Sequence, residues 1–263
     1  MKKSYGLTFL FLAGVMILLA SMKGVKKDHR SIYQITVYHF NAAAQEKVLD
    51  DYLQQALLPA LHRLQIKNIG VFKAHANDTA SDKLLYVFIP LTSPDAVSAV
   101  KQQLDLDKAY QTAAAAYKDA AYDNPPYTRM ETILLKAFPL APEPTLPDLT
   151  NERKERVYEL RSYESATEKL FANKVKMFNE GDEIGLFKKL HFNAAFYGEV
   201  TAGSKMPNLM YMTCHENRAA REANWKAFGD APEWKKLSSL PEYQHNVSHI
   251  DITFLYPTDY SDF

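Results

Sequence analysis

Alternating apolar and polar positions predict four strands in the first half of the chain. These segments are rich in β-branched and aromatic residues, and they span 32–40, 68–74, 84–90 and 128–138. Apolar residues at helical spacing predict an amphipathic helix over 45–65, with Pro59 interrupting it. Two more helices are predicted near 94–104, opened by Pro94, and near 107–121.

The second half repeats this order of elements. Its strands are predicted at 157–163, 194–201, 208–215 and 247–256. A capping box, Ser165-x-x-Glu168, predicts where the helix after the first of these strands begins. Helices near 217–228 and 232–240 precede the last strand. Each half therefore follows the order β-α-β-β-α-β, which is the ferredoxin-like arrangement.

Pairs of similar residues in the two halves indicate a gene duplication. Tyr33 and Tyr158 open the first strand of each half and lie 125 residues apart. Further pairs, at offsets of 120 to 128, are Tyr86 with Tyr211, Gly70 with Gly198, and Met130-Glu131 with Ile250-Asp251. Because an internal repeat sets the architecture, we expect an α+β fold of two tandem domains, 31–138 and 155–263. A proline-rich linker, 139–154, joins them.

Charge and cysteine content narrow the class of protein. Lys+Arg and Asp+Glu both number 31, and the sequence pI is about 7.1. A nucleic-acid-binding protein shows a basic excess or stripe, so no nucleic-acid partner is expected. Cys214 is the only cysteine, which excludes an intrachain disulfide, and its place in a strand pattern favours a plain buried residue. The motifs of ATP-driven, dinucleotide-dependent and standard hydrolase chemistry are missing, so these activities are disfavoured.

The first thirty residues have the profile of a signal peptide. Lys2 and Lys3 precede an apolar run over 7–20, which is shorter than the roughly 20 residues that a membrane span needs. We expect an exported protein, periplasmic or secreted. An uncleaved membrane anchor is the alternative, and membrane contact is expected through this segment alone.

Three stretches of the second half carry a resemblance to a known family. They are Val157-Tyr158-Glu159-Leu160-Arg161-Ser162-Tyr163, Asn208-Leu209-Met210-Tyr211-Met212 and Trp225-Lys226-Ala227-Phe228-Gly229-Asp230-Ala231-Pro232-Glu233-Trp234. Over 155–257 the chain resembles the NIPSNAP family, which is part of the dimeric α/β-barrel superfamily. The first half resembles it only in layout, with Gln34 and Thr36 in place of Glu159 and Arg161.

The resemblance implies that two four-stranded sheets pack face to face into a barrel, with one chain supplying both sheets. It implies no settled reaction, because the superfamily includes haem-degrading monooxygenases, quinone-forming monooxygenases and lactone isomerases. Haem is the one cofactor that it leaves open, with His191 as a candidate ligand. The simpler interpretation of His191 is a surface histidine at a helix end, where the dipole favours a cation.

The polar faces of the strands are expected to line this barrel, because side chains alternate between the two faces of a strand. The candidate pocket residues are Thr36, Tyr38, Arg129, Glu131, Glu159, Arg161, Tyr163, His249 and Asp251, with Gln34 and Thr253 beside them. Convergent polar groups make a ligand pocket the default hypothesis for a site. For Glu159, Arg161, Asp251, Arg129 and Glu131, a structural ion-pair network that seals the barrel is the favoured interpretation, and a pocket is the alternative. No metal site is expected from His245 and His249, since four-residue spacing shares a face only on a helix.

Three functions remain open from the sequence. The first is binding of a small aromatic or anionic molecule in the barrel. The second is a cofactor-free or haem-linked monooxygenase or isomerase that uses Arg161, His249 and Asp251. The third is a structural or interaction protein with a filled barrel. A homodimer through outer strands is a further possibility.

Overall fold

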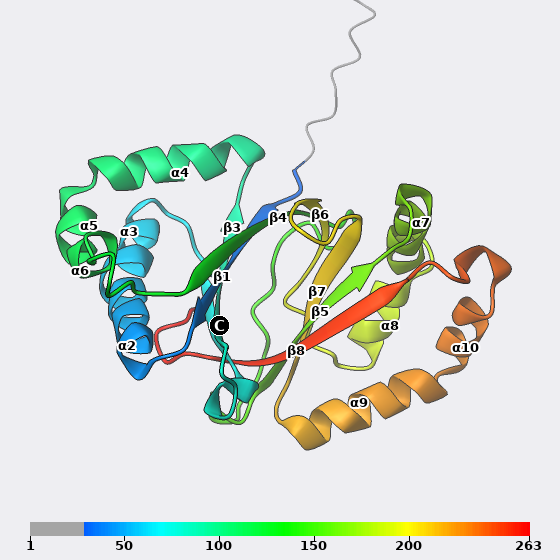
Figure 1. Ribbon diagram of the computed structural model, residues 1–263. Coiled ribbons are helices and arrows are strands. Elements are labelled where there is room, and N and C mark those ends of the chain that lie inside the picture. Colours follow the sequence, from blue (N-terminus) through cyan, green and yellow to red (C-terminus); the bar gives the residue numbers. More distant parts are fainter. Residues whose placement is uncertain (1–28) are drawn as a thin grey trace, which may run out of the picture.

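The computed structural model describes residues 29–263, in which eight strands close one antiparallel barrel (Figure 1). The strands of the first half are β1 (Ile32–Phe40), β2 (Gly70–Ala74), β3 (Lys83–Leu91) and β4 (Arg129–Ala137). Those of the second half are β5 (Val157–Glu164), β6 (Phe196–Ala202), β7 (Asn208–His215) and β8 (His249–Pro257). The expected export segment lies, apart from its last two residues, outside the described residues. Within residues 29–263, no helix is both long and apolar enough to cross a bilayer.

Both halves have the same sheet order. The first is β4-β1-β3-β2 and the second is β8-β5-β7-β6, with β2–β8 and β4–β6 pairing to close the barrel. The predicted tandem ferredoxin-like fold, with both sheets supplied by one chain, is therefore confirmed. Because the barrel is closed, the described strands leave no free edge. A homodimer remains a prediction and would have to use an outer face of the barrel.

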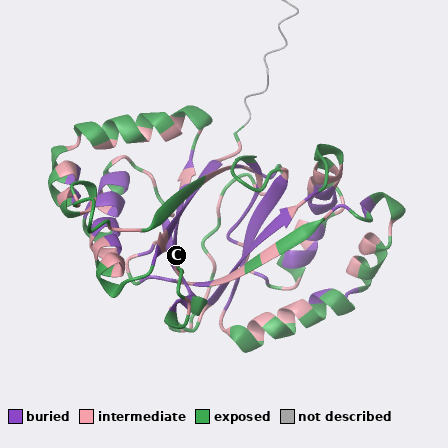
Figure 2. Ribbon diagram, viewed as in Figure 1, coloured by how far each residue is buried: buried purple, intermediate pink, exposed green. Residues whose placement is uncertain are grey.

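Helices cover the outer face of each half (Figure 1). Over the first half lie α2 (Ala43–Tyr52), the π-helix η1 (Leu53–Leu57), α3 (Leu58–Arg63), α4 (Pro94–Leu106), α5 (Lys108–Ala113) and α6 (Ala115–Lys118). Over the second lie α7 (Glu168–Asn179), α8 (Glu183–Lys189), α9 (Arg218–Asp230) and α10 (Pro232–Ser238). Two 3₁₀ segments, η2 (His75–Asp78) and η3 (Pro241–Tyr243), lie in loops. Most strands are largely buried, whereas β4 and β8 are exposed over their first halves (Figure 2).

Two local predictions need correction. The helix predicted over 45–65 is interrupted by the π-helical segment η1, which directly precedes the α3 turn that contains Pro59. A proline ring disfavours a continuous α-helix, and the wider π-turn relieves this conflict. The helix α7 is capped by Thr167, which accepts from the Leu170 amide, and not by Ser165. The Ser165 hydroxyl instead donates to the carbonyl of Asn246 at 2.7 Å.

The strand registers also correct two of the repeat pairs. Thr36 pairs with Val87 in the first half, and Arg161 pairs with Tyr211 in the second. Val87, not Tyr86, is therefore the equivalent of Tyr211. By the same registers Gly70 is equivalent to Phe196 and not to Gly198. The Tyr33–Tyr158 and Glu131–Asp251 equivalences hold, since each pair occupies matching positions in the two sheets.

An apolar cluster with members from all eight strands fills much of the barrel. Phe88 on β3 and Phe196 on β6 meet across the interior, with ring centroids 4.9 Å apart. Phe263 packs against Phe72, Phe88 and Tyr158 and covers one end. This end, where β1 and β5 begin, is closed by side chains.

Candidate functional site

The first strand of each half turns its polar face outward, toward the helices. Tyr158 and Leu160 belong to the cluster inside the barrel, whereas Tyr163 belongs to the core between β5 and its helices. The predicted orientation of Glu159, Arg161 and Tyr163 is therefore wrong. Alternation shows which residues share a face. It does not show which face points inward, because both faces of this strand are buried.

Glu159 is the centre of a buried network under α9. It accepts from Arg161 Nε at 2.6 Å, from Arg221 Nε at 2.7 Å and from Trp225 Nε1 at 2.7 Å. Arg161 also donates to the Tyr163 hydroxyl at 2.9 Å, and its guanidinium lies 3.8 Å from the Trp225 ring. Burial opposes the charge on Glu159, but the bonds from Arg221 and Arg161 outweigh it and lower the pKa of the carboxyl. These contacts form a structural ion-pair network outside the barrel.

The matching polar face of β1 is also covered by helices. Tyr38 packs against Tyr117 and Tyr127, and the Tyr117 hydroxyl donates to the Tyr38 hydroxyl at 3.3 Å. Gln34 and Thr36 line a separate space between this face and the helices of the first half. Thr36 and Tyr38 thus do not line the barrel interior either.

Residues of β4 and β8 behave differently. Asp251 pairs with Ser162, and Thr253 pairs with Leu160, so both share the inward face of β5. Glu131 occupies the equivalent position on β4, opposite Val37. Arg129 and His249 come two residues earlier, at the rim of the same end of the barrel. Of the nine predicted pocket residues, the structure brings four to the same mouth of the barrel: Arg129, Glu131, His249 and Asp251.

A cavity of about 230 Å³ opens at this mouth, which we call the open mouth. Its walls are apolar and come from both halves: Val37, Leu84, Tyr86, Ile133, Leu160, Val200 and Met210. Its polar lining consists of His39, Glu131, Ser162, Ser204, Lys205, Asn208, Asp251 and Thr253. Burial raises the pKa of Tyr86, and the charges of Glu131 and Asp251 add to this effect. The Tyr86 hydroxyl therefore stays uncharged at neutral pH in the wall of the cavity.

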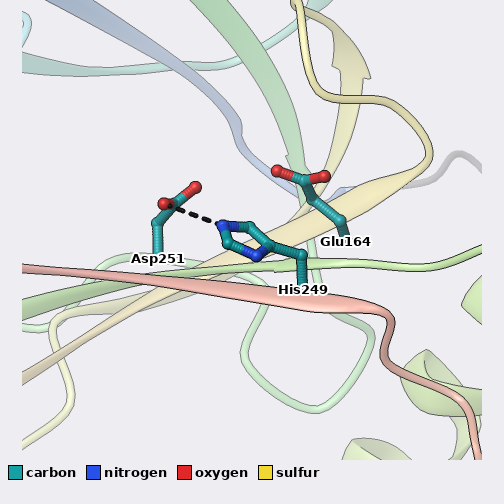
Figure 3. A group of neighbouring side chains, drawn as sticks. All are labelled: Glu164, His249 and Asp251. Atoms are coloured by element: carbon teal, nitrogen blue, oxygen red, sulfur yellow. Dashed lines mark hydrogen bonds and ion pairs between the residues drawn. The ribbon is translucent and has the colours of Figure 1, made fainter.

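Asp251 is held from two sides at the rim. Lys205, from the loop between β6 and β7, forms an ion pair with Oδ2, and His249 Nε2 lies 3.2 Å from Oδ1 (Figure 3). The hydrogen bond from Lys205 is the main cause of a lowered Asp251 pKa. Glu164, at the end of β5, lies beside His249, its register partner.

Sequence reasoning missed much of the lining of the open mouth, and among the residues used below it missed Ser162, Glu164, Lys205, Asn208 and Tyr86. Ser162 shares a face of the predicted strand with the apolar side chains Tyr158 and Leu160, and Glu164 lies one residue beyond that strand. Lys205 and Asn208 belong to the loop and strand that the β5–β7 register brings to Glu164. No signal in the sequence identifies them, because the neighbours come from strands far apart in the chain.

His191 lies outside the barrel. It is exposed after the end of α8 and lines a separate space of about 770 Å³ beside the linker. This position fits the simpler interpretation of His191 as a surface histidine at a helix end. Cys214 is fully buried, and burial raises its pKa well above the ordinary thiol value, as expected for a plain core cysteine.

The closed barrel of two ferredoxin-like halves defines a protein of the α/β-barrel class. Solved structures share this fold: a putative monooxygenase from Fusobacterium nucleatum has a TM-score of 0.54 at 8% identity, covering 87% of this chain and 92% of that one. A putative monooxygenase from Lactobacillus acidophilus has a TM-score of 0.53 at 10% identity, covering 87% and 94%. At such identities the likeness shows the fold alone.

The second half can be assigned more closely. Residues 158–262, which make up most of the second half, match the NIPSNAP family model. A NIPSNAP-like domain protein from Burkholderia xenovorans is similar over 41% of this chain and 89% of its own, at 16% identity and a TM-score of 0.34. No curated protein sequence matches the chain.

Proposed function

We propose that this protein binds a small molecule in the cavity at the open mouth of its barrel. The observation that carries the proposal is the difference between the two ends of the barrel interior. Aromatic side chains fill one end, whereas the other keeps a cavity with apolar walls and a polar rim. Apolar walls with a few placed polar groups are the usual composition of a ligand pocket.

The size and lining of the cavity limit the ligand. Pockets for drug-sized ligands are about 300–1,000 Å³, so 230 Å³ suits a single-ring molecule. Inside the rim, Asn208 donates through Nδ2 to Ser162 Oγ at 2.8 Å, while its Oδ1 has no hydrogen-bond partner among the described residues. A buried acceptor without a partner is costly. We therefore infer a ring that carries a hydroxyl or N–H donor.

Filling the cavity tests the proposal. Val200→Phe adds a ring to the cavity wall, and Met206→Phe adds the same ring at an exposed position of the nearby loop as a control. In ligand-observed NMR with phenol and catechol as probes, we expect saturation transfer from the natural chain and from Met206→Phe. It should be lost in Val200→Phe, whose melting curve must still show a folded protein.

Binding that survives in folded Val200→Phe would place the ligand elsewhere. Native mass spectrometry of the full chain gives a second readout that assumes no probe. A non-covalent adduct should be present in the natural chain and absent from Val200→Phe. A bare mass together with no probe binding would favour a barrel that serves only as structure.

An enzymatic role is the second candidate. Two structures that share the fold are described as putative monooxygenases, although their likeness to this chain extends to the fold alone. Arg161, which the sequence analysis had included in the chemistry, lies outside the barrel, so only His249 and Asp251 remain near the cavity. Oxygen uptake with a quinol, and a Soret band with added haem, test this candidate directly.

We also propose, from the sequence alone, that the protein is exported. The basic start and apolar run of residues 1–30 support it. Cell fractionation with N-terminal sequencing of the mature chain would test it. An unprocessed chain in the cytoplasmic fraction would contradict it.

A further inference from the structure

Three side chains with metal-ligating atoms meet at the rim of the open mouth. Glu164, His249 and Asp251 each offer one ligand atom, and these atoms lie within 4.8 Å of one another. The strand register accounts for this meeting, since Glu164 pairs with His249 across β5 and β8, and Asp251 follows on the same face. Figure 3 shows the imidazole between the two carboxylates.

A buried oxygen next to this group lacks a partner. Asn208 pairs with Glu164 across β5 and β7, so the two side chains are neighbours on one face. Asn208 is 3% exposed, and its Oδ1 accepts no hydrogen bond within the described part of the chain. Amide carbonyl oxygens are common ligands of divalent cations. This free acceptor is an observation independent of the three clustered side chains.

The duplicated half provides an internal comparison. The registers make His39 equivalent to Glu164, Glu131 equivalent to Asp251, and Arg129 equivalent to His249. A guanidinium at the central position repels a cation and cannot act as a ligand, because it has no lone pair to offer. Among the described residues, the second half thus offers the donor set that a metal ion needs, and the equivalent positions of the first half do not.

We propose that Glu164, His249 and Asp251 bind a divalent first-row transition-metal ion such as Mn²⁺ at the open mouth of the barrel. Two carboxylate oxygens and one imidazole nitrogen suit such ions. Asn208, the register neighbour of Glu164 and a lining residue of the cavity, would accept from a metal-bound water through its unpartnered Oδ1. This site goes beyond the binding of an organic molecule in the cavity, and its three ligands do not depend on such binding, although both proposals use Asn208 Oδ1 as an acceptor.

Lys205 competes for the same carboxylate. Its ammonium pairs with Asp251 Oδ2, so an arriving metal ion must displace this cation. Lys205 lies on the loop between β6 and β7 and is not itself one of the proposed ligands. Removal of the Lys205 charge therefore takes away the competing cation and leaves all three proposed ligands in place.

Titration of the full chain with Mn²⁺ alone, followed by the EPR signal of free Mn²⁺, tests the site. We expect one bound ion per chain. His249→Arg, which copies the arrangement at Arg129, should weaken binding at least about tenfold, since loss of even an outer partner costs 10- to 100-fold. Lys205→Met should instead tighten binding, roughly tenfold, by removing a like charge.

His245→Asn is the matched control, since His245 is an exposed histidine near β8 that belongs to no part of the donor set. It should bind Mn²⁺ like the natural chain. Equal losses in His245→Asn and His249→Arg, or weaker binding in Lys205→Met, would overturn the proposal. So would the absence of saturable Mn²⁺ binding in the natural chain. Because no organic probe is present, this result is independent of the phenol and catechol experiments.

Discussion

His215 illustrates how a single buried residue couples the structure to pH. It is 1% exposed at the end of β7, and burial lowers its pKa to about 4. Asn224 Nδ2 lies 3.2 Å from Nδ1, and Thr213 Oγ1 lies 3.2 Å from Nε2. The Asn224 amide donates to Nδ1, so the neutral imidazole carries its proton on Nε2 and donates to Thr213. Protonation of Nδ1 would turn this acceptor into a donor and break the hydrogen bond from Asn224.

A pH-dependent stability follows from this arrangement. The unfolded chain protonates His215 near pH 6.5, whereas the folded chain does so near pH 4. The contribution of neutral His215 to the free energy of unfolding is therefore fully present above pH 6.5. It is lost as pH falls from 6.5 to 4, by roughly 3 kcal/mol in total. Denaturant unfolding at pH 7 and pH 4.5 should show a smaller pH difference for His215→Gln. An unchanged difference would mean that other groups carry it.

At the scale of elements, the contact between α9 and β5 covers the polar face of β5 in the second half. Arg221 and Trp225 reach from α9 to Glu159, and Arg161 completes the network from β5 itself. All of these bonds are sheltered by the aromatic core under the helices. Breaking a buried ion pair costs about 3–5 kcal/mol, because it leaves an uncompensated charge.

Arg161→Met should therefore weaken the fold and leave the cavity at the open mouth intact. We expect a loss on the order of 3 kcal/mol in denaturant unfolding, with unchanged binding of phenol by the protein that remains folded. Arg129→Met, at the exposed rim, is the control and should change stability little. Full stability of Arg161→Met, combined with lost phenol binding, would return Arg161 to the ligand site.

At the scale of the whole molecule, the barrel is closed at one end and open at the other. Phe263 contributes to the closed end through its contacts with Phe72, Phe88 and Tyr158. Arg153 fixes this segment by donating to the carbonyl oxygens of Thr258 at 2.9 Å and Ser261 at 3.2 Å. The asymmetry of filling between the two ends gives the molecule a single candidate entrance to its interior.

Phe263→Ala should destabilise the molecule by about 3–5 kcal/mol, the usual cost of removing a buried phenylalanine. Calorimetric melting of the full chain measures this loss. Phe263→Leu retains most of the volume and should recover a large part of it. A melting temperature unaffected by Phe263→Ala would show that the closed end is held by the strands alone.

The sequence by itself determined most of the elements and the duplication, and the family resemblance implied the barrel. The exact repeat pairs needed the strand registers, whereas alternation, helical spacing and short similar segments are local properties, so they can be recognised without coordinates. Tyr33 and Tyr158 were matched correctly for this reason, and so were Glu131 and Asp251. The NIPSNAP resemblance of the second half is confirmed by the match of residues 158–262 to the family model.

Only the tertiary structure decided which face of β1 and β5 points into the barrel. Both faces are buried, one by the opposite sheet and one by helices, so burial alone does not orient the strand. Partners from α9 made the outer side favourable for Glu159 and Arg161. The composition of the open mouth could not be predicted from the sequence either, because Glu164, Asn208 and Asp251 become neighbours only through the registers of three strands.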